Sequence, residues 1–233
     1  MRLVVLTGSG VSAESGVSTF RDKDGVWARH DWREVATPEG FAADPEHVHE
    51  FYNARGRRLA TVLPNPAHEA LVRLESGLAA KGGAFLLVTQ NVDDLHERAG
   101  SKSLLHMHGE LLRARCEACG ASRPWTDDLS TATACLGCAS RGLMRPDVVW
   151  FGETPVFMEE IAAAISRADL FVSIGTSGSV YPAAGFVNEA RLRHIPCVEL
   201  NLEPSENAHC FTDARYGKAT EIVPRWVDET LRG

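Results

Sequence analysis

The sequence predicts an α/β fold in which a parallel sheet is covered by helices and carries a small second domain. Short apolar runs of strand length alternate along the chain with stretches of helical period, which is the pattern of a parallel sheet. Two long stretches, residues 22–64 and 116–146, lack this alternation and are predicted to be insertions. The runs expected to form strands are Leu3 to Leu6, Phe85 to Thr89, Ser103 to Met107, Leu170 to Ile174, Val198 to Leu200 and Glu221 to Val223.

The helical stretches are recognised by apolar residues that recur on one face. One follows Asn65-Pro66 and ends near Gly77, Met158 to Arg167 form another, and Glu46 to Val62 form a third within the first insertion. Asn before Pro is a typical helix start. The expected large domain comprises residues 1–21, 65–115 and 147–233, and the small domain combines the helical insertion 22–64 with the segment 116–146.

Composition places the chain among globular proteins. Its 233 residues are 44% hydrophobic and 24% charged, which excludes disorder and fibrous repeats. A net charge of −7 without a block of basic residues argues against nucleic acid or an anionic membrane as the main partner. The first apolar run is too short for a membrane span or a signal peptide. We expect a cytoplasmic monomer that requires neither nucleic acid nor a membrane.

Four of the six cysteines form two C-x-x-C pairs that are separated by fifteen residues. Two such turns can present four thiolates to one tetrahedral ion, so they predict a structural zinc site. A redox dithiol or two disulfides are the alternatives, and disulfides are rare in a chain without a secretion signal. The expected zinc ligands are Cys116, Cys119, Cys135 and Cys138.

A glycine-rich turn follows the first expected strand. Gly8, Gly10 and Ala13 have the spacing of a dinucleotide fingerprint, in which backbone N–H groups at a helix start bind a pyrophosphate. Any tight turn from strand to helix favours glycine, so this pattern alone is weak. A dehydrogenase would show a second strand ending in an acidic residue about 20 residues further on, but this chain has a polar loop at residues 19–27. The sequence therefore indicates dinucleotide binding of a different kind.

Two polar clusters follow later strands. Gln90, Asn91 and Asp93 come directly after one strand, and His106 and His108 lie at the end of the next. The carboxyl ends of parallel strands face the ligand crevice of an open sheet, so these positions favour function. A helix cap by Asn91 or Asp93 is the alternative. His106 is compatible with a structural role, whereas His108 lies beside a glycine at the crevice edge and is predicted to be functional.

Taken in order, these motifs resemble the sirtuin family over nearly the whole chain. The resemblance rests on the glycine-rich loop, the cluster after Thr89, His108-Gly109-Glu110, the four cysteines, Gly175-Thr176-Ser177 and Asn201-Leu202-Glu203. It implies a Rossmann-like sheet with helices on both faces. It also implies a bacterial NAD-dependent protein deacylase that consumes NAD and releases nicotinamide and 2'-O-acyl-ADP-ribose. Acyl-lysine segments of other proteins would bind as an added strand.

The resemblance also implies roles for individual residues. His108 matches the general base, which takes a proton from a ribose hydroxyl. The zinc would do no chemistry, because four thiolates close its coordination sphere. The residues implied in NAD binding are Gly8, Ser9, Gly10, Ala13, Glu14, Phe20, Arg21, Trp27, Gln90, Asn91, Asp93, Gly175, Thr176, Ser177, Asn201, Glu203 and Ala219. Ser9 departs from the alanine usual in sirtuins. Those implied along the substrate peptide are Val149, Phe151, Gly152 and Glu153.

The helix expected at 46–62 carries an arginine within its apolar stripe. On a helical wheel Arg55 falls in the middle of the stripe, while Arg57 projects on the opposite face. An arginine in an apolar stripe needs a partner or a ligand, and pairing with a glutamate of the protein is the alternative reading. Tyr52-x-x-Arg55 matches the signature of sirtuins that prefer succinyl- or malonyl-lysine. The resemblance thus implies desuccinylase and demalonylase activity beside deacetylase activity.

Three other functions remain open from the sequence. A mono-ADP-ribosyltransferase would use the same NAD pocket. A nicotinamide-dependent oxidoreductase would reduce or oxidise its cofactor without consuming it. A zinc-ribbon interaction module would retain a nucleotide-binding fold without chemistry.

Overall fold

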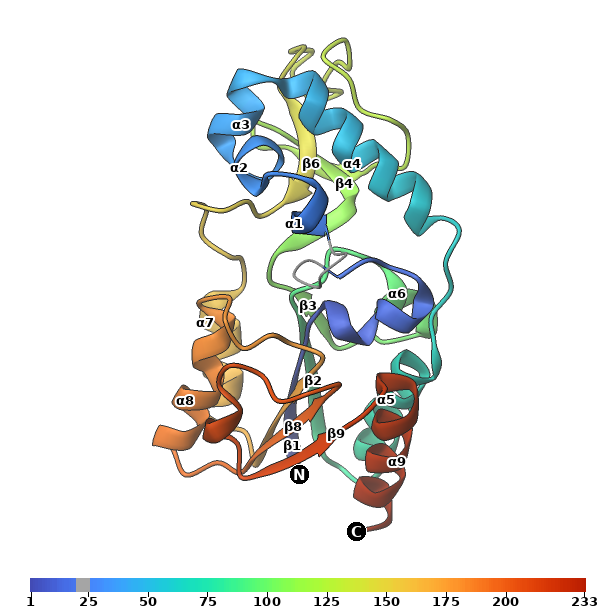
Figure 1. The fold of residues 1–233 in the computed structure, drawn as a ribbon, viewed down its shortest axis with the longest axis vertical. Coiled ribbons are helices and arrows are strands. Elements are labelled where there is room, and N and C mark those ends of the chain that lie inside the picture. The colour runs from blue at the N-terminus through green and yellow to red at the C-terminus, as the bar shows by residue number, and fades with distance from the viewer. Residues whose placement is uncertain (20–25) are drawn as a thin grey trace.

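The computed structural model describes residues 1–19 and 26–233. Its central sheet is parallel, with the strand order β3-β2-β1-β7-β8-β9, and occupies the lower part of Figure 1, below a smaller domain. This confirms the predicted fold class. The strands are β1 (Arg2–Thr7), β2 (Ala84–Thr89), β3 (Leu104–His106), β7 (Leu170–Ile174), β8 (Cys197–Asn201) and β9 (Asp213–Tyr216).

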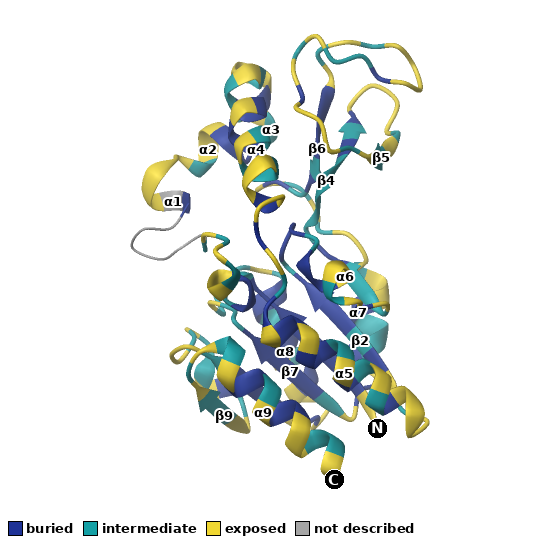
Figure 2. Ribbon diagram, turned by 90° about the vertical axis from the view of Figure 1, so that its right-hand side faces the viewer, coloured by how far each residue is buried: buried dark blue, intermediate teal, exposed yellow. Residues whose placement is uncertain are grey.

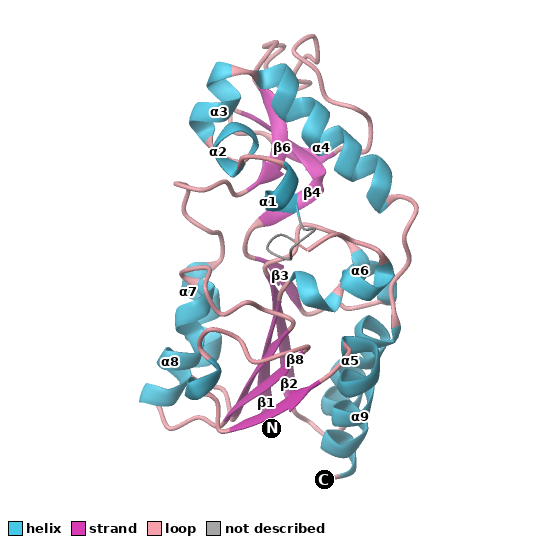
Figure 3. Ribbon diagram, in the orientation of Figure 1, coloured by secondary structure: helices cyan, strands magenta, loops and turns pink. Residues whose placement is uncertain are grey.

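Helices cover both faces of this sheet (Figure 3). The helices α5 (Pro66–Ala80) and α9 (Ala219–Arg232) pack on one face, where Leu3 and Val5 of β1 are buried. The helices α7 (Met158–Ile165) and α8 (Phe186–Leu192) pack on the other, where Val4 and Leu6 are buried. A strand whose successive side chains enter two cores must be apolar throughout, which explains the continuous run in β1. Within the described residues, no helix has both the length and the apolar character needed to cross a membrane.

Helix α5 begins where the sequence predicted and continues past its predicted end. The Asn65 side chain accepts a hydrogen bond from the Ala67 N–H at 2.9 Å, which caps the first turn. Gly77 lies inside the helix and does not end it. A Cβ at this position would lie 2.5 Å from the Leu231 side chain of α9, so the glycine permits close packing of the two helices.

Two elements at the end of the chain differ from the sequence-based expectation. The run Glu221 to Val223, expected to be a strand, lies within helix α9, so that prediction is wrong. The helix buries Ile222, Val223, Trp226 and Val227 together. This helical period cannot be recognised from the three residues 221–223 alone. The edge strand β9 was not predicted, because Asp213–Tyr216 alternates polar and apolar residues without an apolar run.

The small domain combines helices with an antiparallel sheet of order β5-β4-β6. Its helices pack against β6 and the residues after it, and Figure 2 shows the buried positions of α4 on its inner side. Strand β4 starts before the predicted boundary at residue 115, and β6 continues past the one at 147. The elements are α1 (Val26–Arg29), α2 (Trp32–Val35), α3 (Pro38–Ala43), α4 (Pro45–Leu59), β4 (Gly109–Cys116), β5 (Ser122–Pro124) and β6 (Met144–Val148).

Candidate functional site

The site lies where the two halves of the central sheet meet. The chain runs from β1 outward to β3 on one side and from β7 outward to β9 on the other, so β1 and β7 flank a topological switch point. The turns after these strands touch, since the Gly10 N–H donates to the Gly175 carbonyl at 2.9 Å. A Cβ at Gly8 would lie 2.7 Å from the same carbonyl oxygen. The glycine spacing is therefore required by the close approach of the two turns.

A cleft of about 800 Å³ opens above this point and extends to the small domain. Its volume falls within the usual range for ligand sites. Asp93 lies behind its wall, whereas Phe20, Arg21 and the side chain of Trp27 lie outside the described residues. The predicted NAD-binding residues that line the cleft are Gly8, Ser9, Gly10, Ala13, Glu14, Gln90, Asn91, Gly175, Thr176, Ser177, Asn201, Glu203 and Ala219. The other predicted residues that line it are His108, Tyr52, Arg55, Val149, Phe151, Gly152 and Glu153.

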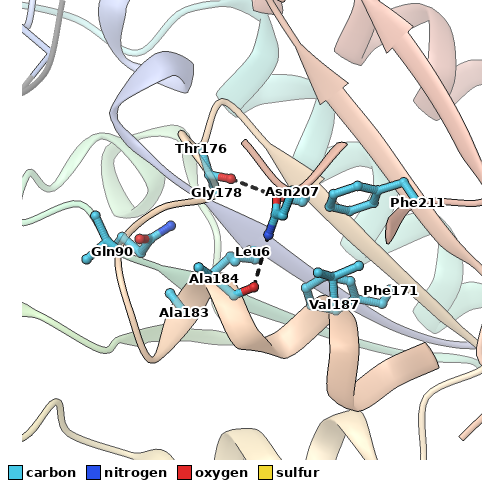
Figure 4. Close-up of a pocket in the computed structure, with 12 residues that line it drawn as sticks. Leu6, Gln90, Phe171, Thr176, Gly178, Ala183, Ala184, Val187, Asn207 and Phe211 are labelled. Atoms are coloured by element: carbon cyan, nitrogen blue, oxygen red, sulfur yellow. Dashed lines mark hydrogen bonds between the residues drawn. The ribbon is translucent and has the colours of Figure 1, made fainter. Parts of the chain in front are cut away.

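Beneath the cleft a second cavity measures about 10 Å³, the size of one water molecule. Gln90 borders both spaces, and Figure 4 shows its side chain opposite Thr176 and Asn207. Asn207 closes one side by donating from Nδ2 to the Ala184 carbonyl at 3.0 Å. The larger cleft is the space that can receive a dinucleotide.

A buried serine connects the two predicted polar residues after β2. The Asn91 Nδ2 group donates to Ser12 Oγ at 3.1 Å, and Ser12 Oγ donates to Asp93 Oδ2 at 3.0 Å. Burial raises the pKa of Asp93, while the Leu95 N–H and the Ser12 hydroxyl oppose this. Ser12 was missed by the sequence analysis, because a serine within a glycine-rich turn is also typical of an ordinary turn.

The orientation of the Ser12 hydroxyl follows from His68. The Asn65 N–H donates to His68 Nδ1 at 3.2 Å, so the neutral ring carries its proton on Nε2, which lies 3.3 Å from Ser12 Oγ. Burial lowers the pKa of His68 to about 4 and keeps the ring neutral. Ser12 therefore accepts from Asn91 and His68, and its own proton is directed to Asp93.

The two histidines at the end of β3, His106 and His108, occupy different environments. His108 lines the cleft, and its Nδ1 donates to the Gln90 carbonyl at 3.1 Å, so the neutral ring leaves its Nε2 lone pair unprotonated. Burial lowers the pKa of His108, which favours this neutral form. His106 is buried, with Nδ1 3.0 Å from the Asn91 carbonyl and Nε2 2.5 Å from Glu97 Oε1. Burial alone would lower the pKa of His106, but the Glu97 carboxylate raises it.

Helix α4 brings Tyr52 and Arg55 to the end of the cleft that lies in the small domain. The guanidinium carbon of Arg55 lies 5.5 Å from the centre of the Phe51 ring. Burial lowers the pKa of Arg55, and the nearby Tyr52 and Asp93 groups counteract this. Arg57 projects to the opposite face, is exposed and forms an ion pair with Asp128. The helical wheel therefore predicted correctly that Arg55 and Arg57 lie on opposite faces of α4.

At the opposite end of the cleft, polar contacts fix the turns that follow β7 and β1. Asn201 Nδ2 donates to the Thr176 carbonyl at 2.8 Å. The Glu14 carboxylate accepts hydrogen bonds from the N–H and the hydroxyl of Thr220, both at 2.9 Å. An anionic group at the start of α9 complements the helix dipole. Glu14 thus has a structural role in joining the glycine-rich turn to α9.

The segment after β6 is held by bonds within the chain. The Val149 N–H donates to the His108 carbonyl at 2.8 Å, and the Phe151 N–H donates to the Ala36 carbonyl at 2.9 Å. The Glu153 carboxylate is bonded to the Arg145 guanidinium and to the Trp150 N–H. These bonds fix the segment along the wall of the cleft, next to His108.

The four cysteines at the top of the small domain form a cluster in which all sulfurs lie within 4.8 Å of one another. The pairs Cys116–Cys138 and Cys119–Cys135 are each separated by 3.7 Å. A disulfide requires about 2.05 Å, whereas a tetrahedral zinc with bonds of about 2.3 Å places its sulfurs about 3.8 Å apart. The donor set and the spacing therefore fit one zinc ion.

Comparisons with known proteins agree with this geometry. A family model described as the Sir2 family matches residues 8–182. The NAD-dependent protein deacylase of Caulobacter vibrioides is 60% identical over 231 residues, which cover 99% of this chain and 97% of that protein. A crystal structure of a Sir2 homologue with NAD is similar to this chain with a TM-score of 0.87 at 39% identity. The match covers 98% of this chain and 90% of the homologue's chain.

A Sir2 variant solved with a deacetylated p53 peptide and 3'-O-acetyl ADP-ribose has a TM-score of 0.85 at 29% identity. It covers 98% of this chain and 93% of its own. The fold, the glycine turn, the cysteine cluster and these matches lead to one conclusion: the chain belongs to the Sir2 family.

Proposed function

We propose that this chain removes acyl groups from lysine side chains of other proteins and consumes NAD in the reaction. The observation that carries the proposal is the environment of His108. Its ring is neutral, its Nε2 lone pair is unprotonated, and it lines a cleft that also contains the glycine-rich turn. The likeness to the NAD-dependent protein deacylase of Caulobacter vibrioides supports it.

Different residues of the chain would have different roles within the cleft. Bound NAD would supply a ribose carbon from which nicotinamide leaves. His108 would act as the general base toward a ribose hydroxyl, a step for which a neutral imidazole is suited. Asn91 and Asp93, fixed by their bonds to Ser12, would hold the nicotinamide and its ribose. The Gly8–Gly10 and Gly175–Ser177 turns would carry the rest of the dinucleotide.

The substrate peptide would run along residues 149–153, beside His108. A peptide among the ligands of a solved relative supports this part of the proposal. The Val149 N–H donates to the His108 carbonyl at 2.8 Å. This contact would bring the acyl-lysine of a peptide on this segment close to the base. The zinc would hold the small domain together and take no part in the reaction.

Tyr52 and Arg55 would select acidic acyl groups such as succinyl and malonyl. Both side chains line the cleft, and positions three apart on a helix share a face. A guanidinium forms charge-assisted hydrogen bonds with a carboxylate. Burial raises the pKa of Tyr52 to about 12, so its phenol stays protonated and can donate to the same carboxylate.

Nicotinamide release tests the proposal directly. The protein is incubated with NAD and one peptide sequence that carries an acetyl-, succinyl- or unmodified lysine, and nicotinamide and peptide masses are followed. We expect nicotinamide release only with acylated peptides, in step with loss of the acyl mass. ADP-ribose attached to a protein side chain would indicate a mono-ADP-ribosyltransferase instead. An increase in the absorbance of reduced cofactor would indicate an oxidoreductase.

A further inference from the structure

We propose that Trp150 is a positioning residue that makes Tyr52 a hydrogen-bond donor toward acidic acyl groups. The Trp150 Nε1–H donates to the Tyr52 hydroxyl oxygen at 2.8 Å. Both side chains are nearly enclosed, at 2% and 7% exposure, and both line the cleft. This inference rests on the proposed role of Tyr52 and Arg55 in acyl selection and adds a residue that the helix pattern does not contain.

The direction of this bond decides what Tyr52 can do. An indole N–H can only donate, so the phenol oxygen is the acceptor, and the single phenol proton must be directed elsewhere. An ionised carboxylate can only accept. Trp150 therefore prevents Tyr52 from donating toward the indole and leaves its proton for a group in the cleft.

The indole itself is held from several sides. The Trp150 backbone N–H donates to Glu153 Oε2 at 2.7 Å. The guanidinium carbon of Arg145 lies 3.1 Å from the centre of the indole ring. Arg145 is 1% exposed and bonds both oxygens of Glu153, at 2.7 Å and 3.0 Å. Reorienting the indole would disturb the ion pair of the buried Arg145, which is costly.

The ring of Phe41 adds a further contact, since its centre lies 5.4 Å from that of Trp150. The Trp150 N–H that donates to Tyr52 is thus held in place by residues that do not contact the acyl group themselves. Preorganised donors lose little freedom when a ligand binds. This gives the pair of Arg145 and Glu153 a role, although neither residue is needed for the proposed base chemistry.

The inference predicts an effect on selectivity. An acetyl group has no distal carboxylate to accept the Tyr52 proton, whereas a succinyl group does. In Trp150→Phe a smaller aromatic ring without an N–H replaces the indole, so the Tyr52 hydroxyl is free to rotate. We expect the ratio of kcat/KM for succinyl- over acetyl-lysine peptides to fall by about three- to tenfold, the range for one neutral hydrogen bond.

The matched control is Trp125→Phe, a tryptophan that packs in the cysteine-bearing part of the small domain. This variant should keep the wild-type ratio. If Trp150→Phe does not fold, site-specific replacement of Trp150 by 3-benzothienylalanine, which keeps the bicyclic ring without an N–H, provides the same test.

A double-mutant cycle identifies the route of the effect. If Trp150 acts through the Tyr52 hydroxyl, then Trp150→Phe should not change the ratio further in a Tyr52→Phe background. An equal loss for both peptides, or the same change of ratio in both backgrounds, would overturn the inference. A wild-type ratio in Tyr52→Phe alone would overturn both the inference and the role of Tyr52 in acyl selection. Absence of any acyl-dependent nicotinamide release in the wild type would overturn the proposed function.

Discussion

The substitution Arg55→Met is expected to reduce activity toward succinyl-lysine selectively. Methionine keeps a long apolar stem in the buried stripe of α4, so the change removes the guanidinium with little loss of packing. Burial desolvates the Arg55 guanidinium and lowers its pKa. A charge-assisted hydrogen bond to the ligand carboxylate contributes about 1.5–3 kcal/mol, which corresponds to a loss of roughly 10- to 150-fold in kcat/KM.

The assay compares two peptides that differ only in the acyl group, with NAD at saturation and deacylated peptide measured by mass spectrometry. Acetyl-lysine has no carboxylate, so its kcat/KM should change by much less than that of succinyl-lysine. Arg57→Met is the matched control, because Arg57 is exposed on the opposite face of α4 and pairs with Asp128. It should leave both values close to wild type.

Equal losses for the two acyl groups in Arg55→Met would refute the reasoning. Arg55 would then serve the packing or the electrostatics of the cleft, including its interaction with Asp93. A succinyl-selective loss in Arg57→Met of the same size would refute it as well, because the effect would not depend on which face carries the charge.

Three further outcomes follow from the same structure. His108→Tyr should lower the deacylation rate by ~10²–10⁴-fold while the zinc content and circular dichroism stay unchanged; wild-type turnover would remove His108 from the base role. Because burial lowers the pKa of His108, its neutral form persists below the usual value of about 6.5, so kcat/KM should decline only as the pH falls below that value; an acid limb with a midpoint above about 7 would contradict this. Elemental analysis should find one zinc per chain, and a chelator should lower the melting temperature and then the activity; purified protein that is active and free of zinc would exclude the site.

The central sheet could be predicted because its strands are buried on both faces. The interior of a strand such as β1 is a continuous apolar run, here Leu3 to Leu6, which distinguishes it from the periodic pattern of the helices. Edge strand β9 has only exposed or half-buried residues and mixed polarity, so no apolar run marks it in the sequence. The run Glu221 to Val223 was misassigned because three residues are too few to distinguish the period of a strand from that of a helix. The helical period becomes visible only when Trp226 and Val227 are included.

The candidate site was predictable where chemistry and strand ends coincide. His108, Asn91 and the cysteines have few alternative roles at their positions, so their residue types were informative. Ser12 was not found, because its importance comes from contacts with Asn91, Asp93 and His68 that lie 56 to 81 residues away in sequence.

Trp150 and Arg145 were also beyond the reach of the sequence. A tryptophan after two valines is typical of a core, and nothing in the spacing indicates that its N–H donates to a tyrosine on α4. Long-range hydrogen bonds of this kind depend on how the small domain folds over the sheet, which local periodicity does not specify.

A single-turnover experiment tests the central claim most directly. Enzyme in excess over an acyl-lysine peptide is mixed with NAD, and all products are measured by mass spectrometry. The account predicts nicotinamide, deacylated peptide and O-acyl-ADP-ribose in equal amounts, with no free carboxylic acid at early times. Deacylated peptide and free acid formed while NAD remains intact would contradict it.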